Sequence, residues 1–224
     1  SPNSPQECFD LTIEAFNLSE RWRTPVLLMT DEVVGHMTER VTIPEPDTIT
    51  LTPRRLTTLP PEEYRPFEPD EDLVPPMCEF GKGYRIHVTG LTHDERGYPD
   101  VTAGMQQRVI PRLVDKIRKN ADQIVRYEES GLEDAEVVVL CYGITSRVAL
   151  MAVEQARAMG HKVGFIRLIV AWPFPEPLIR DLAKRVRGFV VPEINLGQMC
   201  LAVERCAAGT PTRLVANAGG SVHS

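Results

Sequence analysis

From Leu132 onward the sequence alternates short β-branched segments with segments of helical periodicity. The predicted strands cover residues 136–142, 162–168, 189–191 and 213–216, and the predicted helices cover residues 147–159, 175–186 and 196–207. Strands that alternate with helices of this length are typical of a parallel sheet with right-handed crossovers. We therefore predict an open parallel α/β sheet for this part of the chain.

The third predicted strand leads into a carboxylate, Glu193, and a turn containing Gly197 then opens the next helix. Ligands and partner surfaces gather at the carboxyl ends of strands in open parallel sheets. Glu193 could pair with a partner's cation or act in acid–base chemistry, or it could hydrogen-bond the N-terminus of the following helix. Because a lone glutamate is weak evidence for catalysis, we favour a structural or interface role. Asn195 and Gln198 add amide groups, so all three residues are candidates for a substrate pocket or an interface.

A second candidate site is the polar loop between Gly90 and Gly97, which contains Thr92, His93, Asp94 and Glu95. Adjacent residues in a loop rarely face one metal ion, and no second ligand cluster follows at a usable spacing, so we predict no metal site here. A polar surface or interface loop is one alternative. The other is a loop that lines the rim of a substrate pocket.

Turn residues also mark the start of the first helix after the predicted 136–142 strand. Gly143, Thr145 and Ser146 predict a turn and a helix cap. Backbone N–H groups at such a position can hold an anion, but a plain capped helix is the expectation. The sequence contains neither a G-x-G-x-x-G nor a P-loop motif, so nucleotide binding has little support.

The N-terminal part begins with a predicted helix, in which Ser4 and Glu7 form a capping box and Pro5 takes the first helical position. Thr24 and Pro25 end this helix, and residues 25–29 then predict a short buried strand. One helix and one strand cannot bury a core alone, so we expect residues 1–41 to be the end of a larger domain.

Residues 42–110 differ in character, because nine of the 19 prolines fall between Pro44 and Pro76. Proline fixes φ and removes a backbone donor, which indicates an extended arm rather than a sheet. The arm could be a disordered linker or an ordered segment that wraps a neighbour. Aromatic residues such as Tyr64, Phe67 and Tyr84 favour ordering. A helix is then predicted over residues 111–126, with one apolar stripe.

Composition excludes some classes of function. The net charge of −6 gives no basic footprint for nucleic acid, and no apolar stretch reaches the length of a membrane span. The five cysteines form no C-x-x-C pair, which suggests reduced thiols in the cytoplasm and no iron–sulfur cluster held by this chain alone. The chain begins with Ser1 rather than methionine, so we expect a processed, engineered or partial polypeptide.

Taken together, these motifs resemble those of a known family. Residues 7–36 resemble the end of an α subunit of 2-oxoacid:ferredoxin oxidoreductases. Within that family, residues 90–97, 172–175 and 191–198 are similar to the 2-oxoglutarate branch.

The resemblance implies a fold and a reaction. Residues 1–41 would end a pyrimidine-binding thiamine-diphosphate domain, residues 42–110 would form the proline-rich arm and polar loop, and residues 111–224 would form a transketolase-C-terminal-like domain. Thiamine diphosphate with Mg²⁺ and an iron–sulfur cluster would be present in a complex with a β subunit. The complex would act on 2-oxoglutarate and coenzyme A (CoA) and exchange electrons with ferredoxin, in either direction.

The sequence also departs from the family. Its pyrimidine-domain motifs for cofactor activation and substrate binding have no match here, and the C-terminus lacks an expected further helix. The resemblance therefore implies that the cofactors are bound mainly by the β subunit or by a missing N-terminal part, and that this chain alone is inactive and holds none. The alternative function is a non-catalytic assembly or interaction domain of such a complex.

Overall fold

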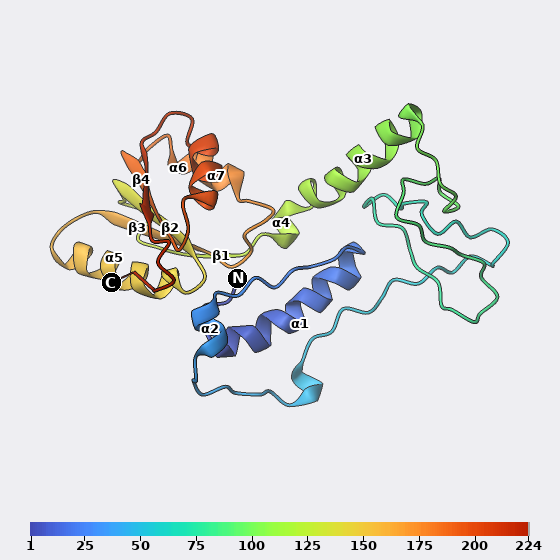
Figure 1. Ribbon diagram of the computed structural model, residues 1–224, viewed down its shortest axis with the longest axis horizontal. Helices are drawn as coiled ribbons and strands as arrows, with labels where there is room; N and C mark the ends of the chain where they lie inside the picture. Colours follow the sequence, from blue (N-terminus) through green and yellow to red (C-terminus); the bar gives the residue numbers. More distant parts are fainter. Residues whose placement is uncertain (224) are drawn as a thin grey trace. The chain divides into compact units, whose positions relative to one another are not determined.

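The computed structural model describes residues 1–223, which form two compact units (Figure 1). The first unit comprises Ser1–Thr12, Leu28–Pro44 and Val125–Ser224, and the second comprises Ile13–Leu27 and Glu45–Ile124. Helix α1 (Pro5–Trp22) contributes to both units. The predicted division into residues 1–41, 42–110 and 111–224 stays a prediction.

A five-stranded sheet organises the first unit, with the strand order β1-β3-β2-β4-β5. The four parallel strands are β2 (Val137–Tyr142), β3 (Val163–Leu168), β4 (Gly188–Glu193) and β5 (Thr212–Ala216). In register, Val139 of β2 lies opposite Phe165 of β3 and Val190 of β4. The predicted parallel α/β sheet is therefore confirmed, and all four of its predicted strands are present.

The fifth strand, β1 (Tyr127–Ser130), was missed by the sequence analysis and pairs antiparallel with β3. Its four residues are all exposed, so it lacks the alternation of apolar and polar residues that marks a half-buried strand. Strand β1 lies at one edge of the sheet, where charged side chains are common.

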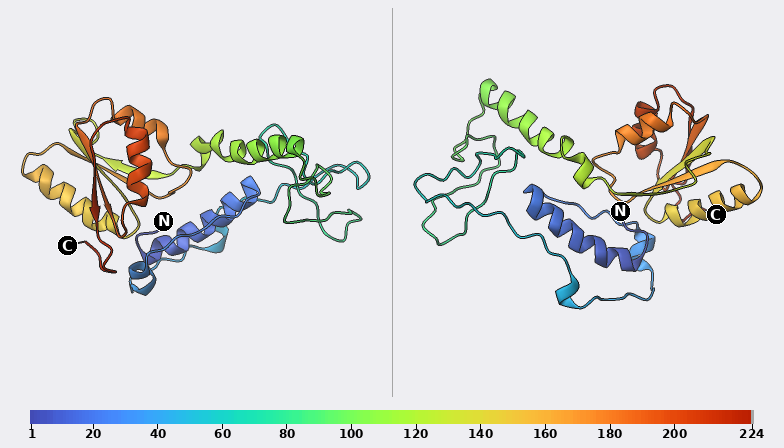
Figure 2. Two further views of the ribbon diagram at one scale, coloured as in Figure 1. Left: turned by 45° about the horizontal axis from the view of Figure 1, so that its top comes forward. Right: turned by 180° about the vertical axis from the view of Figure 1, so that it is seen from behind.

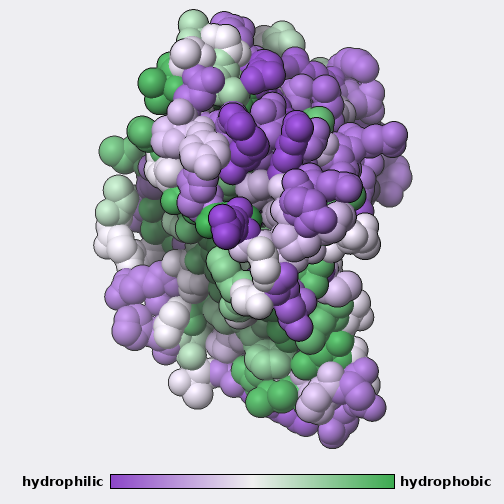
Figure 3. All heavy atoms as spheres, turned by 90° about the vertical axis from the view of Figure 1, so that its right-hand side faces the viewer, coloured by the Kyte–Doolittle hydropathy of each residue, from purple (hydrophilic) through white to green (hydrophobic). Residues whose placement is uncertain are grey.

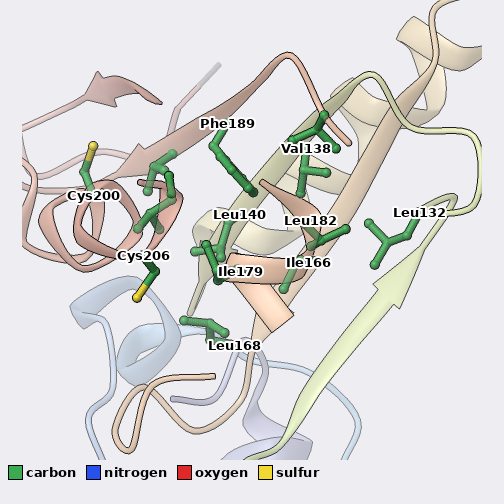
Figure 4. Packing of buried hydrophobic residues seen from close by; sticks show 14 of the residues in the cluster. Leu132, Val138, Leu140, Ile166, Leu168, Ile179, Leu182, Phe189, Cys200 and Cys206 are labelled. Atoms are coloured by element: carbon green, nitrogen blue, oxygen red, sulfur yellow. The ribbon is translucent and has the colours of Figure 1, made fainter. Parts of the chain in front are cut away.

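Helices cover both faces of the sheet. Helices α6 (Glu176–Leu182) and α7 (Gln198–Ala207) pack on one face, and α5 (Thr145–Ala158) lies on the other (Figure 1). The larger core lies between the sheet and helices α6 and α7 and is shown in Figure 4. It includes Val138, Leu140, Ile166, Leu168, Ile179, Leu182 and Phe189. This burial fixes the strands whose carboxyl ends carry one candidate site.

Helix α7 begins two residues later than predicted because Gly197 precedes it with a φ of 104°. A Cβ atom at Gly197 would lie 2.8 Å from Cδ2 of Leu214. The left-handed backbone therefore favours glycine here, and a larger residue would also have to displace the end of the Leu214 side chain.

The predicted strand at residues 25–29 is wrong. These residues join no sheet, and Leu27 and Met29 are 80% and 65% exposed instead of buried. A single strand gains no ladder hydrogen bonds without a neighbouring strand. Helix α2 (Glu32–His36) follows this segment.

The helix predicted over residues 111–126 is corrected to α3 (Ala103–Arg118) and a separate short helix, α4 (Ala121–Ile124). Thr102 caps α3, because its side chain accepts a hydrogen bond of 3.4 Å from the Met105 N–H. Pro111 lies inside α3 rather than at its start, at the cost of one backbone donor.

The proline-rich segment follows an irregular path along which its aromatic residues make specific contacts, and the choice between a disordered linker and an ordered arm stays a prediction. Between residues 42 and 102 the segment contains one short 3-10 helix, η1 (Pro46–Thr48), and is drawn largely as an irregular trace in Figure 2, whereas residues 103–110 belong to α3. The Tyr64 hydroxyl donates to the Pro76 carbonyl at 2.9 Å, and the Tyr84 hydroxyl donates to the Leu59 carbonyl at 2.8 Å. The two tyrosine rings meet edge to face, with centroids 5.2 Å apart. Whether the arm wraps a neighbour stays a prediction.

Candidate functional site

The carboxylate of Glu193 is buried at the end of β4, where only 1% of the residue is exposed. It accepts hydrogen bonds from the Met199 N–H at 3.0 Å and from the Cys200 N–H at 2.7 Å. These are two of the first N–H groups of α7, which have no partner within the helix. The structure thus shows the helix-capping alternative for Glu193, in which a negative charge also meets the positive end of the helix dipole.

Tyr142, at the end of β2, completes this cluster. Its hydroxyl donates to Oε2 of Glu193 at 3.0 Å and accepts from Nδ2 of Asn195 at 2.9 Å. Burial, together with the Glu193 carboxylate, raises the pKa of Tyr142 to about 12. Sequence reasoning missed Tyr142, although it ends a strand whose neighbour in a parallel sheet would bring it near Glu193.

Asn195 and Gln198 shape the turn before α7. Oδ1 of Asn195 accepts from the Gly197 N–H at 2.7 Å and from the Gln198 N–H at 3.2 Å. The Glu193 and Asn195 side chains thus meet at the Tyr142 hydroxyl, and Gln198 takes part through its backbone N–H; the role of these residues in a substrate pocket or an interface stays a prediction. Since three donors already occupy the Glu193 carboxylate, the geometry favours a structural role over acid–base chemistry.

The N-terminus of α5 is also occupied by a carboxylate of the chain itself. Oδ2 of Asp31 accepts from the Ile144 N–H at 2.7 Å, next to Gly143, whose φ is 56°. The predicted cap from Thr145 and Ser146 is wrong, because the N-cap residue is Ile144, whose side chain makes no cap bond, and the Ser146 hydroxyl instead donates to the Gly143 carbonyl at 2.7 Å. This helix end therefore holds no free anion site.

The polar loop lies in the second unit and is folded by Asp94. Oδ1 of Asp94 accepts from the backbone N–H groups of Arg96 at 2.9 Å and Tyr98 at 3.0 Å, and Oδ2 pairs with the Arg96 guanidinium at 2.9 Å. Glu95 lies 3.7 Å from the guanidinium of Arg108, and its carbonyl accepts from the Phe67 N–H at 2.9 Å. The contacts of Asp94 and Glu95 thus stabilise the loop. Among residues 1–223, no group of three or more His, Cys, Asp or Glu side chains could hold a metal ion.

Thr92 and His93 instead line a pocket of about 330 Å³ within the second unit. One wall comes from the loop and another from α3, which supplies Val109, Arg112, Leu113 and Lys116. The remaining lining residues are Arg23, Phe67, Pro75, Gly90 and Leu91. Of the four predicted loop residues, two therefore face a pocket and two do not.

Stacking holds the pocket wall in place. The rings of Phe67 and His93 have centroids 3.9 Å apart, and the guanidinium of Arg23 lies 5.0 Å from the Phe67 centroid. Nδ1 of His93 lies 3.1 Å from the Asp94 carbonyl, which can only accept, so this nitrogen carries the proton. A Cβ atom at Gly97 would lie 3.1 Å from Cε2 of Phe67, so the glycine lets the loop close over this ring.

The two candidate sites lie in different units. Glu193, Asn195 and Gln198 belong to the first unit, and the loop from Thr92 to Glu95 belongs to the second. Arg23, Arg112 and Lys116 were missed by the sequence analysis, since a cation that lines a pocket has no signature in a single sequence.

Two family models match the chain. The model described as pyruvate flavodoxin/ferredoxin oxidoreductase, thiamine-diphosphate-binding, matches residues 1–110. The model described as pyruvate:ferredoxin oxidoreductase core domain II matches residues 135–224.

Curated relatives align with the whole chain. The 2-oxoglutarate synthase subunit KorA of Methanothermobacter thermautotrophicus is 48% identical over 225 residues, covering 100% of this chain and 59% of the relative. KorA of Methanocaldococcus jannaschii is 47% identical over 228 residues, which cover 100% of this chain and 59% of that relative. The ketoisovalerate oxidoreductase subunit VorB of Methanothermobacter marburgensis is 34% identical over 222 residues, which cover 99% of this chain and 55% of that relative. The chain thus spans less than two thirds of the length of these relatives.

A solved structure shows the same fold. The 2-oxoglutarate:ferredoxin oxidoreductase of Magnetococcus marinus, which has 2-oxoglutarate, CoA and succinyl-CoA bound, matches with a TM-score of 0.90 and 24% identity. The match covers 99% of this chain and 39% of that chain. On the two family models and the relatives that align over its whole length, the chain belongs to the 2-oxoacid:ferredoxin oxidoreductase family.

Proposed function

We propose that this chain is part of the α subunit of a thiamine-diphosphate-dependent 2-oxoglutarate:ferredoxin oxidoreductase. The observation that carries the proposal is the identity of 46–48% to three KorA subunits over the whole chain, against 34% to VorB subunits. Because these three KorA subunits exceed both VorB subunits in identity, we favour 2-oxoglutarate over a branched 2-oxoacid as the substrate. The KorA subunit of Archaeoglobus fulgidus is 31% identical, which is below VorB, so identity alone does not separate the two groups and the substrate is decided by the assay below.

The proposed reaction consumes 2-oxoglutarate, CoA and oxidised ferredoxin. The carboxylate next to the keto group leaves as CO₂, the remaining succinyl group is transferred to CoA, and the electron pair passes through iron–sulfur clusters to ferredoxin. Thiamine diphosphate, when bound, supplies the nucleophile that attacks the keto carbon. The reverse reaction is a reductive carboxylation.

The assignment of the cofactors follows the family resemblance, in which thiamine diphosphate is bound through a metal ion that needs oxygen ligands. Among residues 1–223, no group of three or more His, Cys, Asp or Glu side chains could hold a metal ion, and the thiamine-diphosphate-binding family model matches residues 1–110. The buried carboxylate of Glu193 is occupied by capping α7. We therefore assign the cofactors mainly to the β subunit, or to parts of the α subunit outside these residues, and expect the isolated chain to be inactive.

A second candidate function is assembly of the complex without a part in its chemistry. An apolar groove of about 380 Å³, lined by α5 and the sheet at Val148, Val190 and Val215 among others, favours an interface in the first unit. Figure 3 also shows hydrophobic areas exposed between hydrophilic ones on the face that it draws. Exposed hydrophobic surface of this kind often marks a protein–protein interface.

We place the complex in the cytoplasm and treat ferredoxin and a β subunit as its protein partners. All five cysteines are free thiols, as expected in a reducing compartment. No helix among residues 1–223 has the length and apolar character to cross a membrane.

The test is dye reduction by the complex that co-purifies with this chain from its native source. The assay supplies CoA and a low-potential viologen with 2-oxoglutarate, pyruvate or a branched 2-oxoacid in separate reactions. Reduction that depends on 2-oxoglutarate and CoA supports the proposal. Preference for another 2-oxoacid overturns the substrate, and no reduction by an intact complex that contains thiamine diphosphate favours the assembly function.

A further inference from the structure

Three cations line the pocket of the second unit, and no carboxylate neutralises them. Among residues 1–223, no ion pair involves Arg23, Arg112 or Lys116. The acid whose charge acts on Arg112 is Glu95, which is itself paired with Arg108 at 3.7 Å. The pocket therefore carries an excess of positive charge.

Neutral backbone carbonyls hold these cations in position. Nζ of Lys116 donates to the Arg23 carbonyl at 3.0 Å, and one guanidinium nitrogen of Arg112 donates to the Leu73 carbonyl at 3.2 Å. A guanidinium nitrogen of Arg23 donates to the Pro66 carbonyl at 2.6 Å. Carbonyl groups fix the direction of each side chain but leave its charge uncompensated.

Lys116 is the most constrained of the three. Only 4% of the residue is exposed, although an ammonium group has three donors and the structure gives it a single acceptor. Burial, together with the charges of Arg112 and Arg23, lowers the pKa of Lys116 to about 8. A buried charge without a counter-charge is costly, so an anion that enters the pocket would recover part of this cost.

We propose that this pocket binds a small molecule that carries two or more negative charges on carboxylate or phosphate oxygens. Lys116 and Arg112 on α3 and Arg23 opposite them supply the charge, and the loop residues Thr92 and His93 line its rim. The volume of about 330 Å³ lies at the lower end of the range for small-molecule sites. The stacking of Arg23, Phe67 and His93 preorganises the wall, which limits the entropic cost of binding.

This inference rests on the cation cluster and not on the proposed function. Both a dicarboxylate such as 2-oxoglutarate and a phosphate group such as those of CoA have the required chemistry. Separate titrations of the full chain with 2-oxoglutarate, CoA and inorganic pyrophosphate distinguish these sources. Acetate at matched ionic strength is the control for weak, non-specific binding of a single charge.

The test is calorimetry on the wild-type chain and on two variants that each remove one positive charge. We expect saturable binding of at least one multiply charged anion and a Kd that is about tenfold or more weaker in Lys116→Met, because a hydrogen-bonded charge pair is lost. Lys119→Gln is the matched control, since Lys119 is exposed and pairs with Asp115 at 2.9 Å; its Kd is expected to equal that of the wild type.

NMR on wild-type chain with isotopically labelled lysine gives a readout that needs no variant. The bound anion is expected to shift the titration midpoint of Lys116 upward from about 8, because a negative charge favours the ammonium form. No saturable binding of any of the three anions overturns the inference. So does binding that Lys116→Met leaves unchanged while the Lys116 midpoint also stays constant.

Discussion

The cap that Glu193 places on α7 makes a quantitative prediction for the variant Glu193→Gln. Glutamine has nearly the same shape, but it replaces one carboxylate oxygen by an NH₂ group and removes the charge. In the protein, Glu193 receives hydrogen bonds from the Met199 N–H, the Cys200 N–H and the Tyr142 hydroxyl. An amide can accept at only one of its two ends, so at least one of these donors loses its acceptor.

The expected loss of stability follows from two contributions. A buried donor left without an acceptor costs about 1–3 kcal/mol. Removing a negative charge from a partly buried helix N-terminus costs up to about 2 kcal/mol. Because Glu193 is only 1% exposed, water cannot replace the lost acceptor. We expect Glu193→Gln to lower the free energy of unfolding by about 3 kcal/mol, combining these ranges.

Urea unfolding of the full chain, followed by circular dichroism, measures this loss. The matched control is Glu204→Gln, which removes an exposed carboxylate from the same helix and should change stability by less than about 0.5 kcal/mol. The expected shift in Tm for Glu193→Gln is about 6–12 °C, at about 2–4 °C for each kcal/mol. Equal midpoints for Glu193→Gln and Glu204→Gln would refute the capping role.

Three further predictions concern neighbouring parts of the chain. Tyr142→Phe should lower the free energy of unfolding by about 1 kcal/mol near neutral pH. Because the folded-state pKa of Tyr142 is raised to about 12, the contribution of its hydroxyl is complete below about pH 10 and is lost as pH rises toward 12. Calorimetric Tm values should therefore decline less steeply with pH in the variant than in the wild type over this window. Glu7→Gln should cost about 2 kcal/mol in urea unfolding, because it removes one of two carboxylate partners of Arg167, which is 3% exposed and keeps its pair with Glu128 at 3.0 Å. Burial raises the pKa of Glu7, but the hydrogen bonds from Arg167 and the Asn3 N–H and the nearby positive charges together lower it by more, so the contribution of Glu7 is present above the unfolded-state pKa and is lost as pH falls. An unchanged acid limb in the variant argues against the pair. His93→Ala should lower turnover of the intact complex in the viologen assay, since its ring lines the pocket and stacks on Phe67; unchanged kinetics remove the loop from the site.

The parallel sheet was predictable from the sequence because its strands are buried and their apolar runs are separated by helical patterns. Strand β1 was not, since its residues are exposed and its existence depends on pairing with β3. The failed strand at residues 25–29 shows the converse, in which an apolar run finds no neighbouring strand to pair with. The pairing of strands depends on the tertiary structure, so the local periodicity of apolar residues does not predict it.

The same limit applies to the candidate sites. Glu193 was located correctly because it ends a strand, and its capping role follows from the helix that begins just after it. The cation pocket was not predictable, because Arg23 and Lys116 are far apart in the sequence and only the fold joins them through the Arg23 carbonyl. Thr92 and His93 were found by composition, but their contacts with α3 and Phe67 required the structure.

The central claim is tested most directly by the products of the complex that contains this chain. Supplied with 2-oxoglutarate labelled at the carboxylate next to the keto group, with CoA and with oxidised ferredoxin, the complex should release labelled CO₂ and form an equal amount of succinyl-CoA. Omission of CoA or ferredoxin should abolish both products. Formation of neither product by an intact complex that contains thiamine diphosphate, or a clear preference for another 2-oxoacid, would contradict the account.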